Sequence, residues 1–301
     1  MPVPRTLLLT PARPGEGNVA EKFLQDICLA FPRDRLVCFA AKGAGYDDGI
    51  RSPELDWLPL HTDELPNEWA GKQPGARLRA GVVQSLRRLM EIHRQCKLLA
   101  HKVIQLSKQS DIEQILAPIA GPATIYLARH VLNNLDVRFV PIIWDPIDYV
   151  ADNRGYHRIA VSLIQREFAH LMKSAVRCGV ASPGMKAEME QIYGIHCEVI
   201  INSVVPLPPV ERPMSDDYRI VFAGSLYARQ EFQLFMSALN ALDWKVAGRP
   251  LTLTLLGHCV DVPLTACGKK ADIRYLGFWP GQQAQEHLRH YDLGYLPYWL
   301  D

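Results

Sequence analysis

The sequence predicts an α/β protein made of two doubly wound parallel-sheet domains, and three observations support that fold class. Short apolar runs alternate with segments of helical periodicity along the chain, as in parallel sheets covered by helices on both faces. A proline-rich stretch without periodicity interrupts this alternation at 204–217. The 301 residues, 48% of them hydrophobic, are also enough to bury two cores.

The first domain is expected to span 1–203. It opens with a buried strand at Thr6 to Thr10, a loop rich in proline and glycine, and an amphipathic helix with Val19, Phe23 and Ile27 on one face. The segment DIEQILAP at 111–118 fits either a helix start or the beginning of a strand. Further strands are expected within 35–43, 137–144, 175–182 and 197–201, and further helices within 121–135, 159–174 and 183–194.

The second domain is expected at 218–301, after a hinge at 204–217. Its strands are predicted within 219–225, 251–257, 272–278 and 292–297, and its helices within 232–242 and 281–291. Because the chain stops at Asp301, directly after a strand, this domain is expected to be incomplete, and an intact minimal domain is the alternative. Open sheets of this type bind ligands at the carboxyl ends of their strands, so the cleft between the domains is the expected site.

Composition narrows the class of protein. The formal net charge is +1, from 33 basic and 32 acidic residues, so the balance does not favour nucleic acid as the main partner. Seven scattered cysteines form no C-x-x-C pair, which favours core residues in a reducing compartment over disulfides or zinc. No apolar run suits a signal peptide or approaches the roughly 18 residues of a membrane span. We expect a cytoplasmic protein, with peripheral contact at the inner face of the membrane as an open alternative.

The segment RIVFAGSLYARQEF, at 219–232, is the first candidate binding loop. Its strand ends at Gly224, just before a helix, which brings backbone N–H groups and the positive end of a helix dipole to one place. Such an arrangement suits an anion, but it also suits any strand-to-helix connection. Taken alone, the pattern leaves both interpretations open.

Several segments resemble the family 4 glycosyltransferases, which have two facing Rossmann-like domains in the arrangement called GT-B. The resemblance covers nearly the whole chain and rests on the order and spacing of motifs that are weak individually. The matching segments are PGEGNVAEKFL, FAHLMKSAVRCGVASPGMKAEMEQIYG, VIINSVVP, IVFAGSLYARQEFQLFMSALNAL, LTLTLLGH and IRYLGFWPGQQAQEHLRHYDLGYLPY.

The resemblance implies a hexosyltransferase-type enzyme. Such an enzyme moves a sugar from a UDP- or GDP-linked donor to a hydroxyl, usually with retention at the anomeric carbon and with no required cofactor. The second domain would hold the nucleotide sugar, and the first would hold a carbohydrate or lipid-linked acceptor. A role in cell-surface polysaccharide or glycolipid biosynthesis would fit. The family's donor-gripping glutamate segment lies beyond the point where this chain ends, which puts the activity of this chain alone in doubt.

The resemblance also implies roles for the glycine loop. Gly224 would let the backbone approach the donor diphosphate, Ser225 would offer its hydroxyl, and Arg229 would neutralise charge. The family often has Arg directly after this glycine and Lys several residues later, where this chain has Ser225 and Gln230. The departure leaves the assignment open, and the alternative is that Arg229 is an exposed arginine at a helix start.

Two further groups of residues are implied in donor binding. Gly15 and Gly17 lie between the first strand and helix and would approach the donor phosphate from the other domain, although they could equally be turn glycines. Phe278 or Trp279, in the segment YLGFWPG, would pack against the nucleotide base, and a place in the aromatic core is the alternative.

Asp145 is the first choice for a catalytic role. It follows an apolar strand directly, where side chains emerge into the expected cleft, and a carboxylate there could orient the attacking hydroxyl and accept its proton. The alternative is an aspartate that caps a turn before Pro146. The spacing of Asp145 and Asp148 is weak support for a metal, because no histidine or loop of oxygen ligands accompanies them, and no metal is expected.

The stretch 77–108 predicts a basic amphipathic helix, since it holds eight basic residues of the Lys and Arg type and a single acidic one, Glu91. Such a helix could lie against anionic lipid, or its apolar stripe could simply pack on the sheet of the first domain.

Other function classes remain open. A non-catalytic binding or scaffold protein on a truncated GT-B fold would explain Ser225 and the expected missing segment. A sugar-nucleotide epimerase would need acid and base residues facing the sugar of the donor. A nicotinamide dehydrogenase is disfavoured because no G-x-G-x-x-G follows the first strand.

Overall fold

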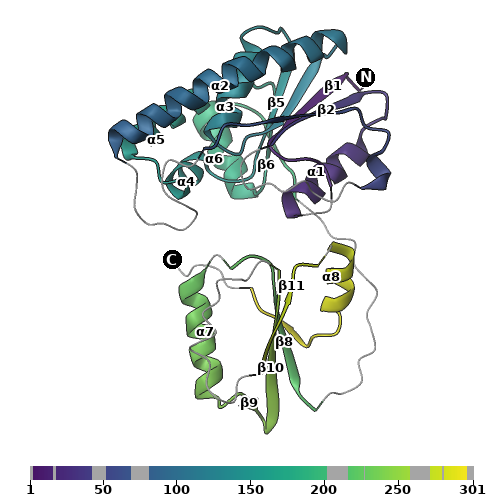
Figure 1. Ribbon diagram of the computed structural model, residues 1–301, viewed down its shortest axis with the longest axis vertical. Coiled ribbons are helices and arrows are strands. Elements are labelled where there is room, and N and C mark those ends of the chain that lie inside the picture. Colours follow the sequence, from purple (N-terminus) through teal and green to yellow (C-terminus); the bar gives the residue numbers. More distant parts are fainter. Residues whose placement is uncertain are drawn as a thin grey trace. The chain divides into compact units, whose positions relative to one another are not determined.

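The computed structural model describes residues 3–15, 18–42, 52–68, 81–201, 216–226, 228–257, 272–279 and 281–296. The chain divides into two compact units, Met1–Ser203 and Val204–Asp301 (Figure 1). Each unit is an α/β structure with a parallel sheet. The proline-rich segment 202–215 lies outside the described residues.

The described residues of the first unit form a seven-stranded, all-parallel sheet with the order β3-β2-β1-β4-β5-β6-β7. Its strands are β1 (Thr6–Thr10), β2 (Leu36–Lys42), β3 (Leu60–Glu64), β4 (Gln114–Pro118), β5 (Arg138–Ile143), β6 (Cys178–Val180) and β7 (Cys197–Val199). The order reverses between β1 and β4, so the topological switch point lies between these two strands.

Helices cover both faces of this sheet. They are α1 (Val19–Ala30), the short η1 (Pro53–Leu55), α2 (Val82–Gln109), α3 (Pro122–Leu132), α4 (Ile147–Asn153), α5 (Arg158–Met172) and α6 (Pro183–Tyr193). Leu7 and Leu9 of β1 pack into the core beneath α2, α3 and α5, whereas Leu8 packs beneath α1. This alternation follows from the two-residue period of a strand, and it makes every residue of β1 buried.

The sequence signals at helix ends agree with the structure. Asn18 caps α1 by accepting a hydrogen bond from the Glu21 N–H at 3.0 Å, and Ser182 caps α6 in the same way. Gly194 ends α6 in the left-handed conformation, with φ of 65°. Val19 is the exception: it was expected on the buried face of α1 but is 76% exposed, because it is the first residue of the helix and precedes the covered turns.

The second unit has a smaller sheet. Its described residues form parallel strands in the order β11-β10-β8-β12, and β9 pairs with β10 in the antiparallel sense. The elements are β8 (Tyr218–Ala223), α7 (Arg229–Ala241), β9 (Lys245–Val246), β10 (Arg249–Leu256), β11 (Asp272–Gly277), α8 (Gly281–Leu288) and β12 (Leu293–Gly294). Figure 1 shows α7 and α8 on opposite sides of this sheet.

The core of the second unit lies between α7 and the sheet. Phe232, Met236 and Leu239, spaced at three and four residues along α7, pack against alternate residues of β8 and β10. Leu253 and Leu255 are almost fully buried in this layer. The helical period expected for 232–242 is therefore confirmed, although α7 begins three residues earlier.

The described residues bear on two further predictions, one about the cysteines and one about membrane spans. Five cysteines lie in the described part of the chain, and all are free and buried, as expected for core residues; they are Cys28, Cys38, Cys96, Cys178 and Cys197. Among the helices of the described residues, none combines the length and the apolar character that crossing a membrane requires.

Candidate functional site

The carboxyl edge of the first sheet carries the candidate residues of that unit. Loops leave this edge after β1, β4 and β5, and Gly15, Gly121 and Asp145 lie in those loops. A small pocket lies at the switch point, with Thr10 and Pro118 in its lining. Since parallel strands end at one edge, the sequence pattern alone brings these loops together.

Asp145 lies two residues beyond β5 and is exposed. Partial burial raises the pKa of its carboxyl, and the nearby Arg154 guanidinium opposes this shift. The residue is exposed, so solvent screens both effects. Asp145 therefore has the position that an acceptor-orienting carboxylate needs, and the role itself stays a prediction.

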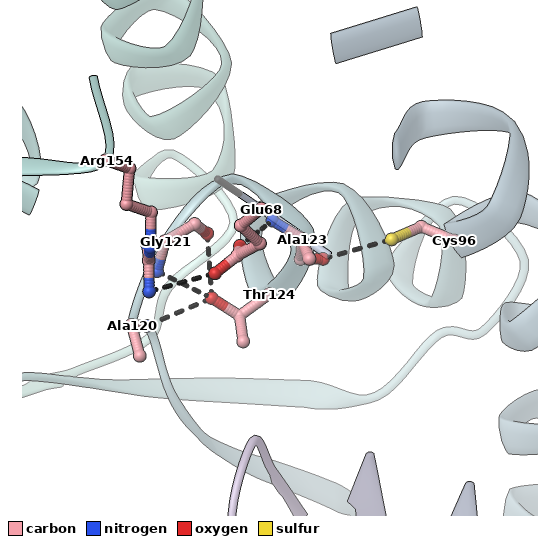
Figure 2. A network of polar contacts seen from close by, with 7 residues as sticks. All are labelled: Glu68, Cys96, Ala120, Gly121, Ala123, Thr124 and Arg154. Carbon is pink, nitrogen blue, oxygen red and sulfur yellow. Dashed lines mark hydrogen bonds and ion pairs between the residues drawn. The ribbon is translucent and has the colours of Figure 1, made fainter. Parts of the chain in front are cut away.

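A buried polar network lies at the N-terminus of α3, and Figure 2 shows its members. Glu68 Oε1 accepts a hydrogen bond from the Ala123 N–H at 2.5 Å, and Glu68 Oε2 lies 2.9 Å from Arg154 Nη2. The two side chains are only 11% and 16% exposed. The network joins the end of β3, the start of α3 and the end of α4.

The N–H groups at the start of α3 explain why the Glu68 carboxylate lies there. Its N-cap residue, Gly121, has no side chain, and Pro122 at the first helical position has no N–H. Thr124 Oγ1 accepts from the N–H groups of Ala120 and Gly121, at 3.0 and 3.1 Å. The Ala123 N–H is then the first donor along the helix that needs an outside acceptor, and Glu68 supplies it.

Gly121 is required by close approach rather than by a turn alone. A Cβ on this residue would lie 1.6 Å from Arg154 Nη1 and 2.9 Å from Glu68 Oε1. The guanidinium thus lies directly against the backbone of the β4–α3 loop (Figure 2). Any side chain at Gly121 would displace Arg154.

Some buried polar atoms in and near the network have no hydrogen-bond partner among the described residues. Burial raises the pKa of Glu68, even though Arg154 and the Ala123 N–H both lower it. Arg154 Nη1 is buried and has no hydrogen-bond partner among the described residues, and the same holds for Tyr156 Oη. A buried donor left without an acceptor costs on the order of 1–3 kcal/mol.

Tyr156 follows Arg154 by two residues. Its side chain is fully buried, and burial raises the pKa of its hydroxyl. The Glu68 charge raises that pKa further, while the Arg154 charge lowers it.

Of the two predicted glycines after β1, only Gly15 lies within the described residues. It is buried, and its N–H donates to the Glu21 carbonyl at 3.1 Å, so this amide is engaged within its own loop. Gly17 lies outside the described residues. Donor contact by either glycine stays a prediction.

The carboxyl edge of the second sheet carries the other candidates. Gly224 follows β8 with φ of 130°, it is exposed, and no atom of the described residues lies within 4 Å of where its Cβ would be. Ser225 is also exposed, and Arg229 is the exposed first residue of α7. No side chain caps α7, because Ala228 occupies the N-cap position. The structure therefore brings open backbone, a hydroxyl, a cation and a helix N-terminus together.

The loop after β8 is held by contacts with the residues at the end of β10. The Gly224 N–H donates to the Leu256 carbonyl at 2.8 Å, and the Gly257 N–H donates to the Gly277 carbonyl at 2.8 Å. A Cβ on Gly257 would lie 2.5 Å from the Gly224 carbonyl oxygen, so no side chain fits there. These contacts fix the loop after β8 against the end of β10.

Phe278 follows β11 at the same edge and is 43% exposed. Two strand spacings separate β11 from β8, which is about 10 Å. Its neighbour Trp279 is instead held within the unit, with its Nε1–H donating to the Leu276 carbonyl and its ring 4.6 Å from the His287 ring. Phe278 thus has the exposure that a base-stacking role requires.

Sequence reasoning missed Glu68, Gly121 and Tyr156. Gly121-Pro122 just before a segment of helical periodicity is a usable signal for a helix start. Glu68 gave no such signal, since it follows β3, a strand that the sequence pattern did not indicate. In the part of the chain that the structure describes, no three His, Cys, Asp or Glu side chains gather as metal ligands.

The network makes a prediction about pH. The pKa of Glu68 is raised in the folded state, so the folded chain binds a proton that the unfolded chain has already lost. The stability of the wild type relative to Glu68→Gln should therefore be greatest below the unfolded pKa of a glutamate and fall as the pH rises through the folded pKa. Urea unfolding of both chains between pH 4.5 and 7 measures the difference.

The matched variant removes Arg154, the other partner of the ion pair with Glu68. Arg154→Gln leaves the Glu68 carboxylate buried without its cation and should lower the free energy of unfolding by about 3 kcal/mol at pH 7. Arg158→Gln, which changes an exposed arginine of α5, should change it by less than about 0.5 kcal/mol. Equal effects of the two arginine substitutions would contradict the ion pair.

Comparison with known proteins agrees with the fold. Neither a family model nor a curated protein matches this chain. Among solved structures, the α,α-trehalose-phosphate synthase (UDP-forming) of Burkholderia xenovorans, in complex with glucose-6-phosphate, matches at a TM-score of 0.62 and 11% identity, over 97% of this chain and 79% of that chain.

Two other matches cover almost the same range. The sucrose-phosphate synthase of Thermosynechococcus elongatus matches at a TM-score of 0.58 and 11% identity, over 98% of this chain and 77% of that chain. The catalytic domain of starch synthase IV from Arabidopsis thaliana, bound to ADP and acarbose, matches at 0.54 and 10%, over 97% and 77%. At these identities the likeness shows the fold alone, and it confirms the predicted GT-B fold class; membership of family 4 stays a prediction.

Proposed function

We propose that this chain is a glycosyltransferase that moves a sugar from a nucleotide diphosphate sugar to a hydroxyl acceptor. The observation that carries the proposal is the carboxyl edge of the second sheet, where Gly224, Ser225, Arg229 and the N-terminus of α7 come together. The similar solved structures support it, because they include a UDP-forming synthase and a starch synthase bound to ADP.

The donor diphosphate would lie against this edge. Gly224 offers a backbone that no side chain screens, the uncapped start of α7 offers N–H groups, and Arg229 offers a positive charge. Phe278, at the end of β11 two strands away from β8, would stack on the base of UDP or GDP. Donor binding of this kind needs neither metal nor cofactor, since helix dipole and arginine neutralise the diphosphate.

The acceptor would lie at the carboxyl edge of the first sheet. Asp145 is exposed there, so its carboxylate would orient the acceptor hydroxyl and take up its proton. Most of the rate enhancement would come from positioning two substrates and stabilising the departing diphosphate. Retention at the anomeric carbon, a hexose donor and a role in cell-surface polysaccharide or glycolipid assembly complete the proposal.

Helix α2 supports a peripheral place at an anionic membrane, on the cytoplasmic face. One stripe of this helix is exposed from end to end and has no acidic residue; its members are Val83, Arg87, Met90, Arg94, Lys97, Leu98, His101, Gln105 and Lys108. Val83, Met90 and Leu98 are 80, 66 and 62% exposed. A mixture of exposed apolar and basic side chains on one face suits the headgroup region of a bilayer.

The donor site is tested by calorimetric titration with UDP and GDP. Arg229→Ala should weaken nucleotide binding about ten-fold, because it removes one charge-assisted contact to phosphate. Lys245→Ala, which removes a charge from β9 beside the amino end of β10, should leave the affinity unchanged. Equal affinities in wild type and Arg229→Ala would remove Arg229 from the site, and no binding by the wild type would favour a scaffold protein on this fold.

The acceptor role of Asp145 is tested by transfer and donor binding measured side by side. Asp145→Asn should slow transfer by about 100-fold or more while changing the donor Kd less than about two-fold, because only proton uptake and acceptor orientation are lost. Asp136→Asn, just before the amino end of β5, is the matched control. Transfer at the wild-type rate in Asp145→Asn would contradict this role.

Membrane contact is tested by sedimentation with vesicles of phosphatidylglycerol and phosphatidylcholine. Replacing both Arg94 and Lys97 by Gln should reduce the bound fraction several-fold, at about 1 kcal/mol for each charge. The same change at the exposed Lys173 and Arg177, outside α2, should have little effect. Wild-type binding that does not depend on anionic lipid would contradict the proposal.

A further inference from the structure

We propose that Cys178 and Cys197 form a reversible disulfide that joins β6 to β7, so that thiol oxidation holds the last strand of the first sheet in place. Both cysteines are free thiols in the structure. The proposal does not depend on the function proposed above, because both residues begin their strands, at the opposite end from the loops that carry Asp145 and Gly121.

The register of β6 and β7 places the two cysteines directly opposite each other. Each is the first residue of its strand, and Cys178 is the partner of Cys197 in the parallel ladder. Neighbouring strands lie about 4.8 Å apart. Disulfides usually join residues whose Cα atoms are about 4.4–6.8 Å apart, so the backbone already has the spacing that the bond needs.

The two side chains also lie on one face of the sheet. Both belong to the core beneath α2, α3 and α5, and their exposed fractions are 1% and 0%. A hydrogen bond links the Cys178 thiol to the Cys197 thiol, so the sulfur atoms are in contact. Spacing, face and contact therefore all favour a bond between these two residues.

The surroundings make the two thiols unequal. Burial raises the pKa of both, and the hydrogen bond between them raises the pKa of Cys178 further but lowers that of Cys197. The nearby charges act on Cys197 in both senses, because Glu190 and Glu198 raise its pKa and Lys186 lowers it. Since Cys178 stabilises the Cys197 thiolate, Cys197 is the attacking thiol and Cys178 the resolving one.

The oxidant is a small-molecule disulfide, such as glutathione disulfide. The Cys197 thiolate attacks one of its sulfur atoms, which forms a mixed disulfide and releases one glutathione thiolate. Cys178 then loses its proton to water, and its sulfur displaces the second glutathione thiolate. In total the two protein thiols lose two protons and two electrons, one S–S bond forms in the protein, and glutathione disulfide is reduced to two glutathione thiols.

Opening of β7 gives the oxidant access to Cys197. This strand has three residues, it lies at the end of the strand order, and in the described residues its ladder is with β6. The Cys197 N–H points to the outer side, where it donates to Glu190 Oε1 at 3.0 Å rather than to a further strand. A short strand held on one side opens at a lower free energy than the central strands do.

The bond would act on the strand at which the first unit ends. The loop that it closes contains α6, and the unit ends at Ser203, shortly after β7. In the reduced chain β7 can separate from β6, whereas in the oxidised chain the two strands remain joined. Oxidation therefore changes how often this end of the unit opens.

The experiment equilibrates the purified full chain with mixtures of glutathione and glutathione disulfide, blocks the remaining thiols and maps the peptides by mass spectrometry. The wild type should lose the two thiols at 178 and 197 together and yield one peptide pair joined by a disulfide. Cys38→Ala, which removes a thiol from the other core, should form the same pair. In Cys197→Ala, Cys178 should stay free or carry glutathione.

Two results would overturn the proposal, and both come from the wild type, so they do not depend on a variant that folds. One is that the thiols at 178 and 197 remain free at every glutathione ratio. The other is that either of them pairs instead with a different cysteine, such as Cys259 or Cys267, which lie outside the described residues.

Hydrogen exchange tests the effect on β7. The Ile200 N–H donates to the Val180 carbonyl at 2.8 Å, so its exchange reports the separation of β7 from β6. In the oxidised wild type this amide should exchange at least about ten-fold more slowly than in the reduced chain, and the same oxidant should leave its exchange unchanged in Cys197→Ala. A disulfide that forms without slowing this exchange would overturn the role of the bond in holding β7.

Discussion

The burial of β1 on both faces is the constraint on which the first unit depends. Leu7, Leu8 and Leu9 are almost completely inaccessible, and successive residues belong to different cores. Burying three leucines stabilises the folded state by on the order of 5–8 kcal/mol. Burial of successive residues on opposite faces requires a central strand with helices over both faces. Once β1 is central, β2 and β4 must flank it, and the reversal of strand order between β1 and β4 follows.

In both units the polar candidate residues lie at the carboxyl edge of the sheet, where the loops leave the strands. The strands themselves are apolar, so polar function falls to the residues just beyond them. In the second unit these residues offer mainly backbone, an exposed glycine and a helix start. In the first unit they offer charged side chains, and one of those charges is buried against the start of α3.

The sequence predicted the strongly periodic elements well. The strand at Thr6–Thr10 has the expected bounds, α3 and α6 lie where glycine, proline and serine signals placed them, and the GT-B fold class is confirmed. Four elements of the described residues were missed: the very short η1 and β9, and also β3 and α4. β3 is an edge strand with the sequence LHTDE and little burial, and α4 has only seven residues, so neither shows a clear hydrophobic period.

The candidate site could be predicted only where a strand end carried it. Asp145 and Gly224 follow apolar runs directly, so topology placed them at the edges without any knowledge of packing. Glu68 lies 55 residues from the amide that it caps, and its burial depends on tertiary contacts with Arg154. No local pattern encodes a charge that becomes buried in this way.

The contact between Gly257 and the Gly224 carbonyl limits how this protein could be redesigned. With 2.5 Å between that oxygen and a Cβ at 257, even alanine is too large, so position 257 itself does not accept a side chain for a new contact. New side chains are better introduced at Ser225 and Arg229, which are already exposed. A library built on this scaffold should therefore randomise those two positions and keep both glycines fixed.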